Sequence, residues 1–330
     1  MFKFDKTLLT NNFNTLLFRS LGWIILGLIF SFFINNILVL SLNYPTFYSI
    51  LNKLNVNSFI ILGIYILGVV LPIFFVILSP SNTLRFDAEI LHKFNVYFIR
   101  SCFWVVILVG LTDFIISFMR VERILPILFN DSFVRALGRS AFVGFYIHLP
   151  LILLGFIIAL FTRTIGFPWL ALIIVAGELL IVISRFVFSY EQSFMGDLVR
   201  YWYGALFLFA SAYTLYENGH VRVDVFYASM STKTRGIVNA FGSILLGVST
   251  CIVIIIIGFD GKQSIINSPI MNFEITQTGT VGMFIKYQMA AFLGIFAITM
   301  LIQFISYFFE SVADYRSEVG HRDHTTSLLS

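Results

Sequence analysis

Charged side chains are scarce in this sequence. Only 12% of its 330 residues are Asp, Glu, Lys or Arg, whereas 58% are hydrophobic, and the mean hydropathy is +0.92. A soluble domain carries roughly 25% charged residues, because its surface must be solvated. The shortage therefore excludes a soluble globular domain, a disordered chain and a nucleic-acid-binding module, and it indicates an integral membrane protein embedded in a lipid bilayer.

Cysteine and histidine are also rare, with two and five residues respectively. Cys102 and Cys251 both fall in apolar runs, so we expect them to be small packing residues and not a disulfide pair. Only His148 lies in a predicted span, whereas bis-histidine haem ligation needs histidines that face each other from different helices. The sequence has no HExxH or CxxC motif and no phosphate-binding glycine loop. We therefore expect no catalytic residue, no cofactor and no bound metal, and we do not expect an enzyme.

Long apolar runs, in contrast, are abundant. A helix that crosses a bilayer needs ~20 mostly apolar residues, because lipid offers no partner for unpaired backbone groups. Eight runs meet this requirement, and they predict an all-α polytopic membrane protein with about eight transmembrane helices. The runs are residues 21–42, 57–78, 101–119, 141–161, 170–188, 198–215, 237–259 and 287–309.

The distribution of Lys and Arg predicts the orientation of these spans, because cytoplasmic connections are enriched in both residues. If the N-terminus is cytoplasmic, the inner connections carry more of them than the outer ones, which places both termini in the cytoplasm. One outer connection, residues 120–140, opposes this bias because it contains four arginines. Its apolar residues recur at helical spacing around Pro126, which predicts a broken amphipathic helix on the outer surface. The alternative is that one N-terminal run does not span the membrane.

Ionisable residues inside predicted spans are functional candidates, because burying them is costly unless they are paired or hydrated. Glu178 and Arg185 are seven residues apart on one face of the fifth run, about two helical turns and ~10 Å along the axis, so they cannot pair directly. We expect Glu178, near mid-span, to make a specific polar contact. Arg185 either reaches the membrane surface or contacts a partner helix. Asp113, near the outer end of the third run, is expected to be hydrated.

The connection after the sixth run contains a polar strip. Between residues 217 and 227, valines alternate with His220, Arg222 and Asp224. An extended strip places alternate side chains on opposite sides, so the valines could pack on helix ends while the three polar groups face a partner. The other interpretation is a solvated inner loop, and composition does not decide between the two. Ser231 is the expected N-cap of the next helix.

These residues resemble a known family. The run His220-Val221-Arg222-Val223-Asp224, with Ala212-Tyr213-Thr214-Leu215 before it, resembles the small membrane subunit of tripartite ATP-independent periplasmic (TRAP) transporters, the DctQ family. Residues 185–188 match that family's Arg-Tyr-Val-Phe signature, with Phe186 in place of Tyr. The acidic position that is usually Glu falls on Asp197. The resemblance extends over residues 164–314, which contain the last four predicted spans.

The resemblance implies a division of the chain into three parts. Residues 1–163 form an N-terminal membrane extension of about four transmembrane helices, residues 164–314 a TRAP small-subunit-like four-helix membrane domain, and residues 315–330 a polar cytoplasmic tail. The family's four-helix subunit lacks the extension. In this chain the N-terminal extension is expected to add scaffold area or to contact lipid.

The resemblance also implies a function. The chain is expected to be the small permease (scaffold) subunit of a secondary transporter in the bacterial inner membrane. That transporter imports a carboxylate-type solute with sodium, and it includes a large TRAP membrane subunit and a periplasmic solute-binding protein. The implied subunit-interface or structural polar residues are Arg185, Asp197, His220, Arg222, Asp224 and Glu178. An alternative from another class is a stand-alone polytopic transporter or channel with its own polar pathway through Asp113, Glu178 and Arg185.

Overall fold

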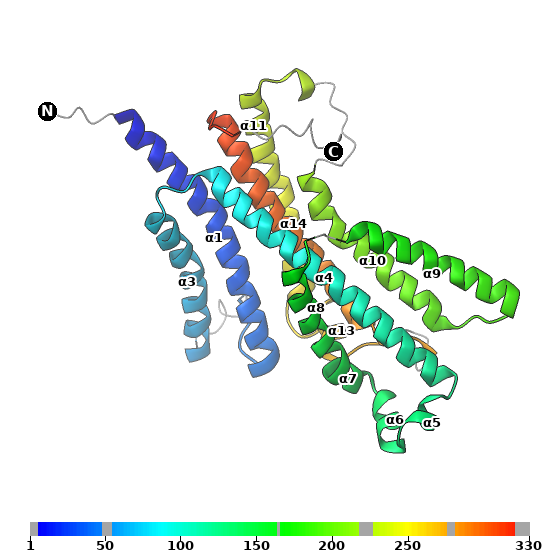
Figure 1. The fold of residues 1–330 in the computed structure, drawn as a ribbon. Helices are drawn as coiled ribbons and strands as arrows, with labels where there is room; N and C mark the ends of the chain where they lie inside the picture. The colour runs from blue at the N-terminus through cyan, green and yellow to red at the C-terminus, as the bar shows by residue number, and fades with distance from the viewer. Residues whose placement is uncertain (1–5, 48–54, 164–165, 218–226, 276–280, 321–330) are drawn as a thin grey trace. The chain divides into compact units, whose positions relative to one another are not determined.

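A computed structural model of the chain describes residues 6–47, 55–163, 166–217, 227–275 and 281–320. Every regular element within these residues is a helix (Figure 1). Seven of the helical segments are long and apolar enough to cross a membrane. The predicted class, an all-α polytopic membrane protein, is therefore confirmed.

The long helical segments coincide with the eight predicted runs. They are α1 (Lys6–Leu42), α3 (Val56–Leu78), α4 (Leu84–Val121), the continuous α7, η1 and α8 (Ser140–Val143, Gly144–His148, Leu149–Phe161), α9 (Phe167–Phe188), α10 (Ser193–Tyr216), the continuous α11, η3 and α12 (Thr232–Gly242, Ser243–Val248, Ser249–Phe259) and α14 (Lys286–Tyr315). Shorter helices are α5 (Leu125–Leu128), α6 (Asp131–Leu137), η2 (Tyr227–Ser229) and α13 (Asn267–Met271).

Helix α10 contains the predicted sixth span but is not among the seven apolar segments. It is long enough, with 24 residues. Its tyrosines, its tryptophan and Arg200 interrupt its apolar sequence, so it lacks a stretch as apolar as those of the seven segments. The structure therefore confirms a helix at this place, whereas its composition alone does not mark it as a membrane span.

Helix α4 is much longer than the predicted third span. It has 38 residues and begins at Leu84 instead of residue 101. Its early turns contain Asp87 and Asn95, which lower the local hydropathy, yet both side chains are buried. Each has a partner on a distant helix: Asp87 pairs with Arg19, and Asn95 Nδ2 donates to the Thr299 carbonyl at 3.0 Å. Because these partners are distant in sequence, a local hydropathy window does not register them, and it begins the helix too late in the chain.

The predicted break between the third and fourth spans is confirmed as two short helices. Pro126 lies in the first turn of α5, where its missing N–H costs nothing. Asn130 caps α6, because its side chain accepts a hydrogen bond from the Phe133 N–H at 3.0 Å. The predicted position of this segment on the outer membrane surface stays a prediction.

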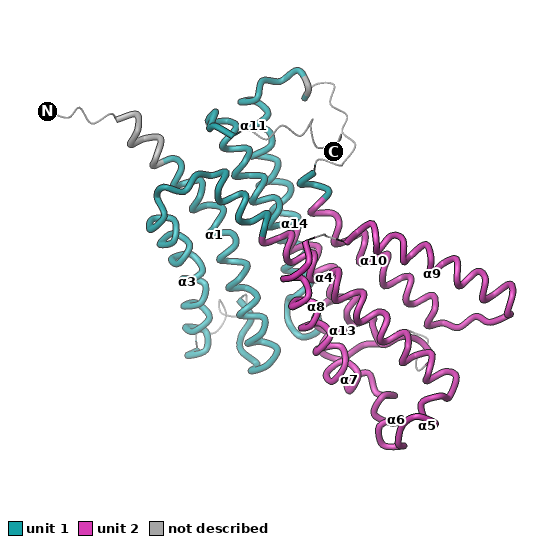
Figure 2. The backbone as a smooth tube through the Cα atoms, viewed as in Figure 1, with its two compact units in different colours: residues 1–93, 214–264, 300–330 teal, residues 94–213, 265–299 magenta. Residues whose placement is uncertain are grey.

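The described chain divides into two compact units (Figure 2). Unit 1 combines residues 1–93, 214–264 and 300–330, and unit 2 combines residues 94–213 and 265–299. Each unit takes segments from both sides of residue 164. The predicted division of the chain at that point, which follows the family resemblance, stays a prediction.

Within unit 1, α1 and α3 approach closely through small residues. A Cβ atom on Gly27 would lie only 2.1 Å from the Gly68 carbonyl oxygen, so neither position has room for a side chain. Ser31 Oγ, one turn further along α1, donates to the Ile64 carbonyl at 3.0 Å. Small residues and interhelical hydrogen bonds are what hold helices together in lipid, where the hydrophobic effect gives them no preference for each other.

Two further expectations concern single residues. Cys102 and Cys251 are buried and free, as predicted. Ser231 caps α11, and its side chain accepts a hydrogen bond from the Thr234 N–H at 3.3 Å.

Candidate functional site

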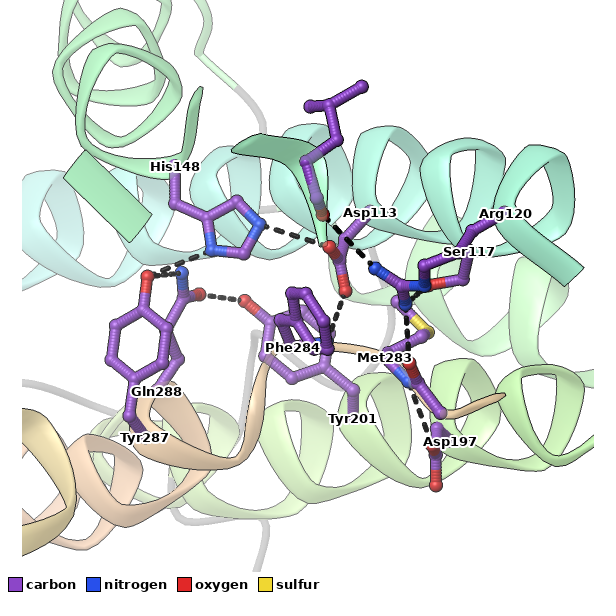
Figure 3. Close-up of polar contacts among 12 residues, drawn as sticks. Asp113, Ser117, Arg120, His148, Asp197, Tyr201, Met283, Phe284, Tyr287 and Gln288 are labelled. Atoms are coloured by element: carbon purple, nitrogen blue, oxygen red, sulfur yellow. Dashed lines mark hydrogen bonds and ion pairs between the residues drawn. The ribbon is translucent and has the colours of Figure 1, made fainter. Parts of the chain in front are cut away.

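The most concentrated polar chemistry of unit 2 surrounds an irregular segment that leads into α14, here called the lead-in segment (residues 282–285). It is not helical, and Met283, Phe284 and Ile285 are at most 1% exposed. Backbone N–H and C=O groups that are buried outside regular structure must find other partners, because each unpaired group carries its full desolvation cost. Side chains from neighbouring helices supply these partners (Figure 3).

Two carboxylates hold the N–H groups of the lead-in segment. Phe284 N–H donates to Asp113 Oδ2 at 2.6 Å, and Met283 N–H donates to Asp197 Oδ2 at 3.1 Å. Asp113 comes from α4 and Asp197 from the first turns of α10, so the segment is held from two helices. Hydrogen bonds from an N–H to a carboxylate are stronger than those between neutral groups, and these two fix the entry of the chain into α14.

Arg120, near the end of α4, holds the lead-in segment through a backbone carbonyl group of that segment. Its Nη2 donates to the Gly282 carbonyl at 2.7 Å and to Ser117 Oγ at 3.0 Å. Its guanidinium carbon lies 4.0 Å from the centre of the Phe284 ring. A planar guanidinium combines stacking with several directed donors, which a lysine cannot do. Arg120 therefore fixes both the backbone and the aromatic ring of the lead-in segment.

A chain of four polar contacts leads from α10 to Asp113. Tyr201 OH donates to Gln288 Oε1, Gln288 Nε2 donates to Tyr287 OH at 3.1 Å, and Tyr287 OH lies 2.8 Å from His148 Nδ1. His148 Nε2 lies 3.4 Å from Asp113 Oδ1. Tyr287 OH therefore contacts both Gln288 and His148. The contact between His148 and Asp113 is the longest of the four and is not a hydrogen bond.

The network joins the two sequence regions predicted above. Asp113, Arg120 and His148 precede residue 164, whereas Asp197 and Gln288 follow it. His148 reaches the network from the π-helical turn η1, and such turns re-aim a side chain relative to a regular α-helix. Buried polar contacts between helices favour the one arrangement of the helices in which these contacts form. The arrangement can therefore position α14.

This network was only partly anticipated from the sequence. The expectation that Asp113 is hydrated is wrong, because its side chain is completely buried and accepts from Phe284 N–H. The error arises because its partners are distant in sequence, 171 residues away in the case of Phe284. From the sequence, His148 is distinguished only as the one histidine in a predicted span. A histidine and an aspartate in neighbouring predicted spans are the signal that indicates the pair.

The structure places the predicted site residues in different surroundings. Asp197 lies in the network. Arg185 is half exposed and pairs with Glu191, with Nε 2.8 Å from Oε2. Glu178 is exposed on α9, and its side chain makes no hydrogen bond or ion pair with any residue that the structure describes. The predicted polar strip of His220, Arg222 and Asp224 lies outside the described residues. The interface roles of all six residues stay predictions.

The turn between α9 and α10 is tied to the end of α4. Tyr190 OH donates to Glu122 Oε1 at 2.6 Å. Burial and then the neighbouring carboxylate of Glu122 raise the pKa of Tyr190 to about 12. The phenol is protonated at neutral pH, and its hydrogen bond ties the α9–α10 turn to Glu122, directly after α4.

Tyr287→Phe tests the network at its centre. The substitution leaves the ring in place but removes the hydroxyl that contacts both His148 and Gln288. We expect the free energy of unfolding to fall by about 1–3 kcal/mol, because buried polar groups lose their partner. Thermal unfolding of the purified protein in detergent measures the effect. Tyr203→Phe, at an exposed position of α10, is the matched control and is expected to change stability by less than ~0.5 kcal/mol. Equal midpoints for the two variants would contradict the network.

Comparison with known proteins identifies the C-terminal part of the chain. Residues 171–313 match the family model described as "Tripartite ATP-independent periplasmic transporters, DctQ component". No curated protein and no solved structure matches the chain. The match lies within the region, residues 164–314, for which the resemblance was predicted. The chain therefore has seven helical segments that are long and apolar enough to cross a membrane, and its residues 171–313 are similar to the DctQ component of tripartite ATP-independent periplasmic transporters, preceded by an N-terminal extension that contains further apolar helices.

Proposed function

We propose that this chain is the small permease subunit of a TRAP secondary transporter that imports a carboxylate-type solute with sodium. The observation that carries the proposal is the family match over residues 171–313. DctQ components work in general with a large TRAP membrane subunit and a solute-binding protein, and the same two partners are proposed here. The proposed location is the bacterial inner membrane, with both termini in the cytoplasm.

The charge distribution supports a scaffold role. Asp113, the most deeply buried acidic residue of the predicted spans, accepts a hydrogen bond from the lead-in segment and lies 3.4 Å from His148, so we assign it a structural role. The proposed parts of the chain are an N-terminal membrane extension (residues 1–163), the small-subunit domain (residues 164–314) and a polar cytoplasmic tail (residues 315–330). The extension contributes Asp113, Arg120 and His148 to the network, so its proposed role is to brace the small-subunit domain.

Uptake into proteoliposomes tests the proposal. Vesicles that contain this chain and the large subunit, supplied with the binding protein and an inward sodium gradient, are expected to accumulate radiolabelled carboxylates. Omission of this chain, the large subunit or the binding protein is expected to abolish uptake, and collapse of the sodium gradient is expected to do the same. Sodium-driven or passive uptake by this chain alone would overturn the proposal in favour of a stand-alone transporter or channel.

A further inference from the structure

Helix α9 is the least covered of the seven apolar segments. In its most apolar stretch 6% of the residues are buried, compared with 17% to 50% in the other six. One side of α9 packs on α10 at Gly177: a Cβ atom on Gly177 would lie 3.3 Å from a methyl group of Val199. The remaining perimeter of α9 is open to lipid or to another protein.

A carboxylate lies in the middle of this open helix. Glu178 is the twelfth of the 22 residues of Phe167–Phe188, so it lies ~16 Å from either end at 1.5 Å per residue. That distance is too great for a short glutamate side chain to reach the membrane surface, as a lysine or arginine near a helix end can. It is exposed and has no partner among the described residues. A charged or polar group at this depth is not stable against lipid alone.

Residues one and two helical turns away extend this position into a surface, here called the Glu178 stripe. Val175, Glu178, Val182 and Arg185 recur at the spacing that places residues on one side of a helix, and all four are exposed. The charge of Arg185 is already matched by Glu191 at 2.8 Å. The unmatched charge of the stripe is therefore the single negative charge of Glu178.

We infer that the Glu178 stripe is where a helix of the large membrane subunit docks, and that this helix presents a basic or hydrogen-bond-donating side chain at the depth of Glu178. The inference rests on the proposed function. A second copy of this chain fits less well, because a two-fold contact on the stripe brings two like-charged carboxylates to the same depth. Lipid cannot form the hydrogen bonds that polar side chains form between helices. A polar residue on α9 therefore favours a partner helix with a matching polar group over the many helices that are only apolar.

Site-specific photocrosslinking tests the docking surface in membranes that contain this chain and a tagged large subunit. A benzophenone amino acid at position 178 is expected to give a product at the combined mass of the two proteins. The control is the same probe at position 180. Leu180 is 64% exposed and differs in depth by two residues, but it faces the opposite side of α9. We expect a much weaker product from position 180.

Substitutions test the chemistry of the contact. Glu178→Leu suits lipid but removes the acceptor, and we expect about three- to tenfold less co-purified large subunit. Glu178→Gln retains a hydrogen-bonding group and is expected to fall between the leucine variant and the wild type, whereas Leu180→Ala is expected to match the wild type. A thermal midpoint of Glu178→Leu equal to that of the wild type shows that the variant is folded.

The outcomes separate the inference from the function on which it rests. If wild-type chain and large subunit do not associate at all, the proposed function fails. If they associate, but the probe at position 178 reacts only with lipid or with a second copy and Glu178→Leu binds the large subunit fully, the docking surface is wrong and the proposed function stands.

Discussion

Asp113→Ala is expected to lower the free energy of unfolding by about 3–5 kcal/mol, because it removes one partner of a buried charged network. The Asp113 carboxylate accepts from Phe284 N–H at 2.6 Å and lies 3.4 Å from His148 Nε2. It also provides negative charge near the guanidinium of Arg120. Alanine supplies none of these contacts, and the buried N–H groups lose their acceptor without gaining water.

The substitution is measured best with two companions. Asp113→Asn keeps the shape and one carbonyl acceptor, so it is expected to cost less than the alanine variant. Asp131→Ala removes an exposed aspartate from the first turn of α6 and is expected to cost at most ~1 kcal/mol. Thermal unfolding in detergent ranks the three variants. A cost of Asp113→Ala as small as that of Asp131→Ala means that the network does not hold the lead-in segment.

The sequence predicts those features of this protein that depend on local pattern. The apolar runs place all eight long helical segments, since one helix satisfies its own backbone within one run. Ser231 was predicted as an N-cap because a cap and its helix are adjacent in sequence. Hydropathy fails where a polar residue is satisfied by a distant one. Asp87 and Asn95 shift the predicted start of α4 for this reason, although both are buried in its first turns.

The candidate site shows the same limit more clearly. Asp197 was singled out through the family resemblance, but its contact with Met283 N–H spans 86 residues and follows no sequence spacing. The contacts that lead from Tyr201 to Asp113 form only where four helical segments meet, and no spacing within the sequence predicts that meeting point. Glu178 is the opposite case, because its position in mid-span is evident from the sequence. The structure adds that no described residue of this chain provides the polar contact expected for it.

A second buried charge pair, in unit 1, gives the other large expected effect. Arg19 and Asp87 are both completely buried, with Arg19 Nε 2.7 Å from Asp87 Oδ2. Arg19 Nη1 also donates to the Ser79 carbonyl at 2.6 Å, and Trp23 Nε1 donates to Asp87 Oδ2 at 2.9 Å. The pair therefore joins α1 to the end of α3 and the start of α4. A paired charge of this kind is costly to break, because the remaining partner stays buried and uncompensated.

Arg19→Met is accordingly expected to lower the free energy of unfolding by about 3–5 kcal/mol, because Asp87 is left as an unpaired buried carboxylate. Addition of Asp87→Leu is expected to restore most of this loss, because two apolar side chains remove the charge problem and retain the packing volume. A double-mutant cycle, read from thermal or denaturant unfolding, measures the coupling between the two positions. Arg185→Met is the matched control, since its pair with Glu191 is half exposed and its removal is expected to cost at most ~0.5 kcal/mol. If the double variant is as unstable as Arg19→Met, the contacts of Arg19 with Ser79 hold these helices together, and the ion pair itself contributes little.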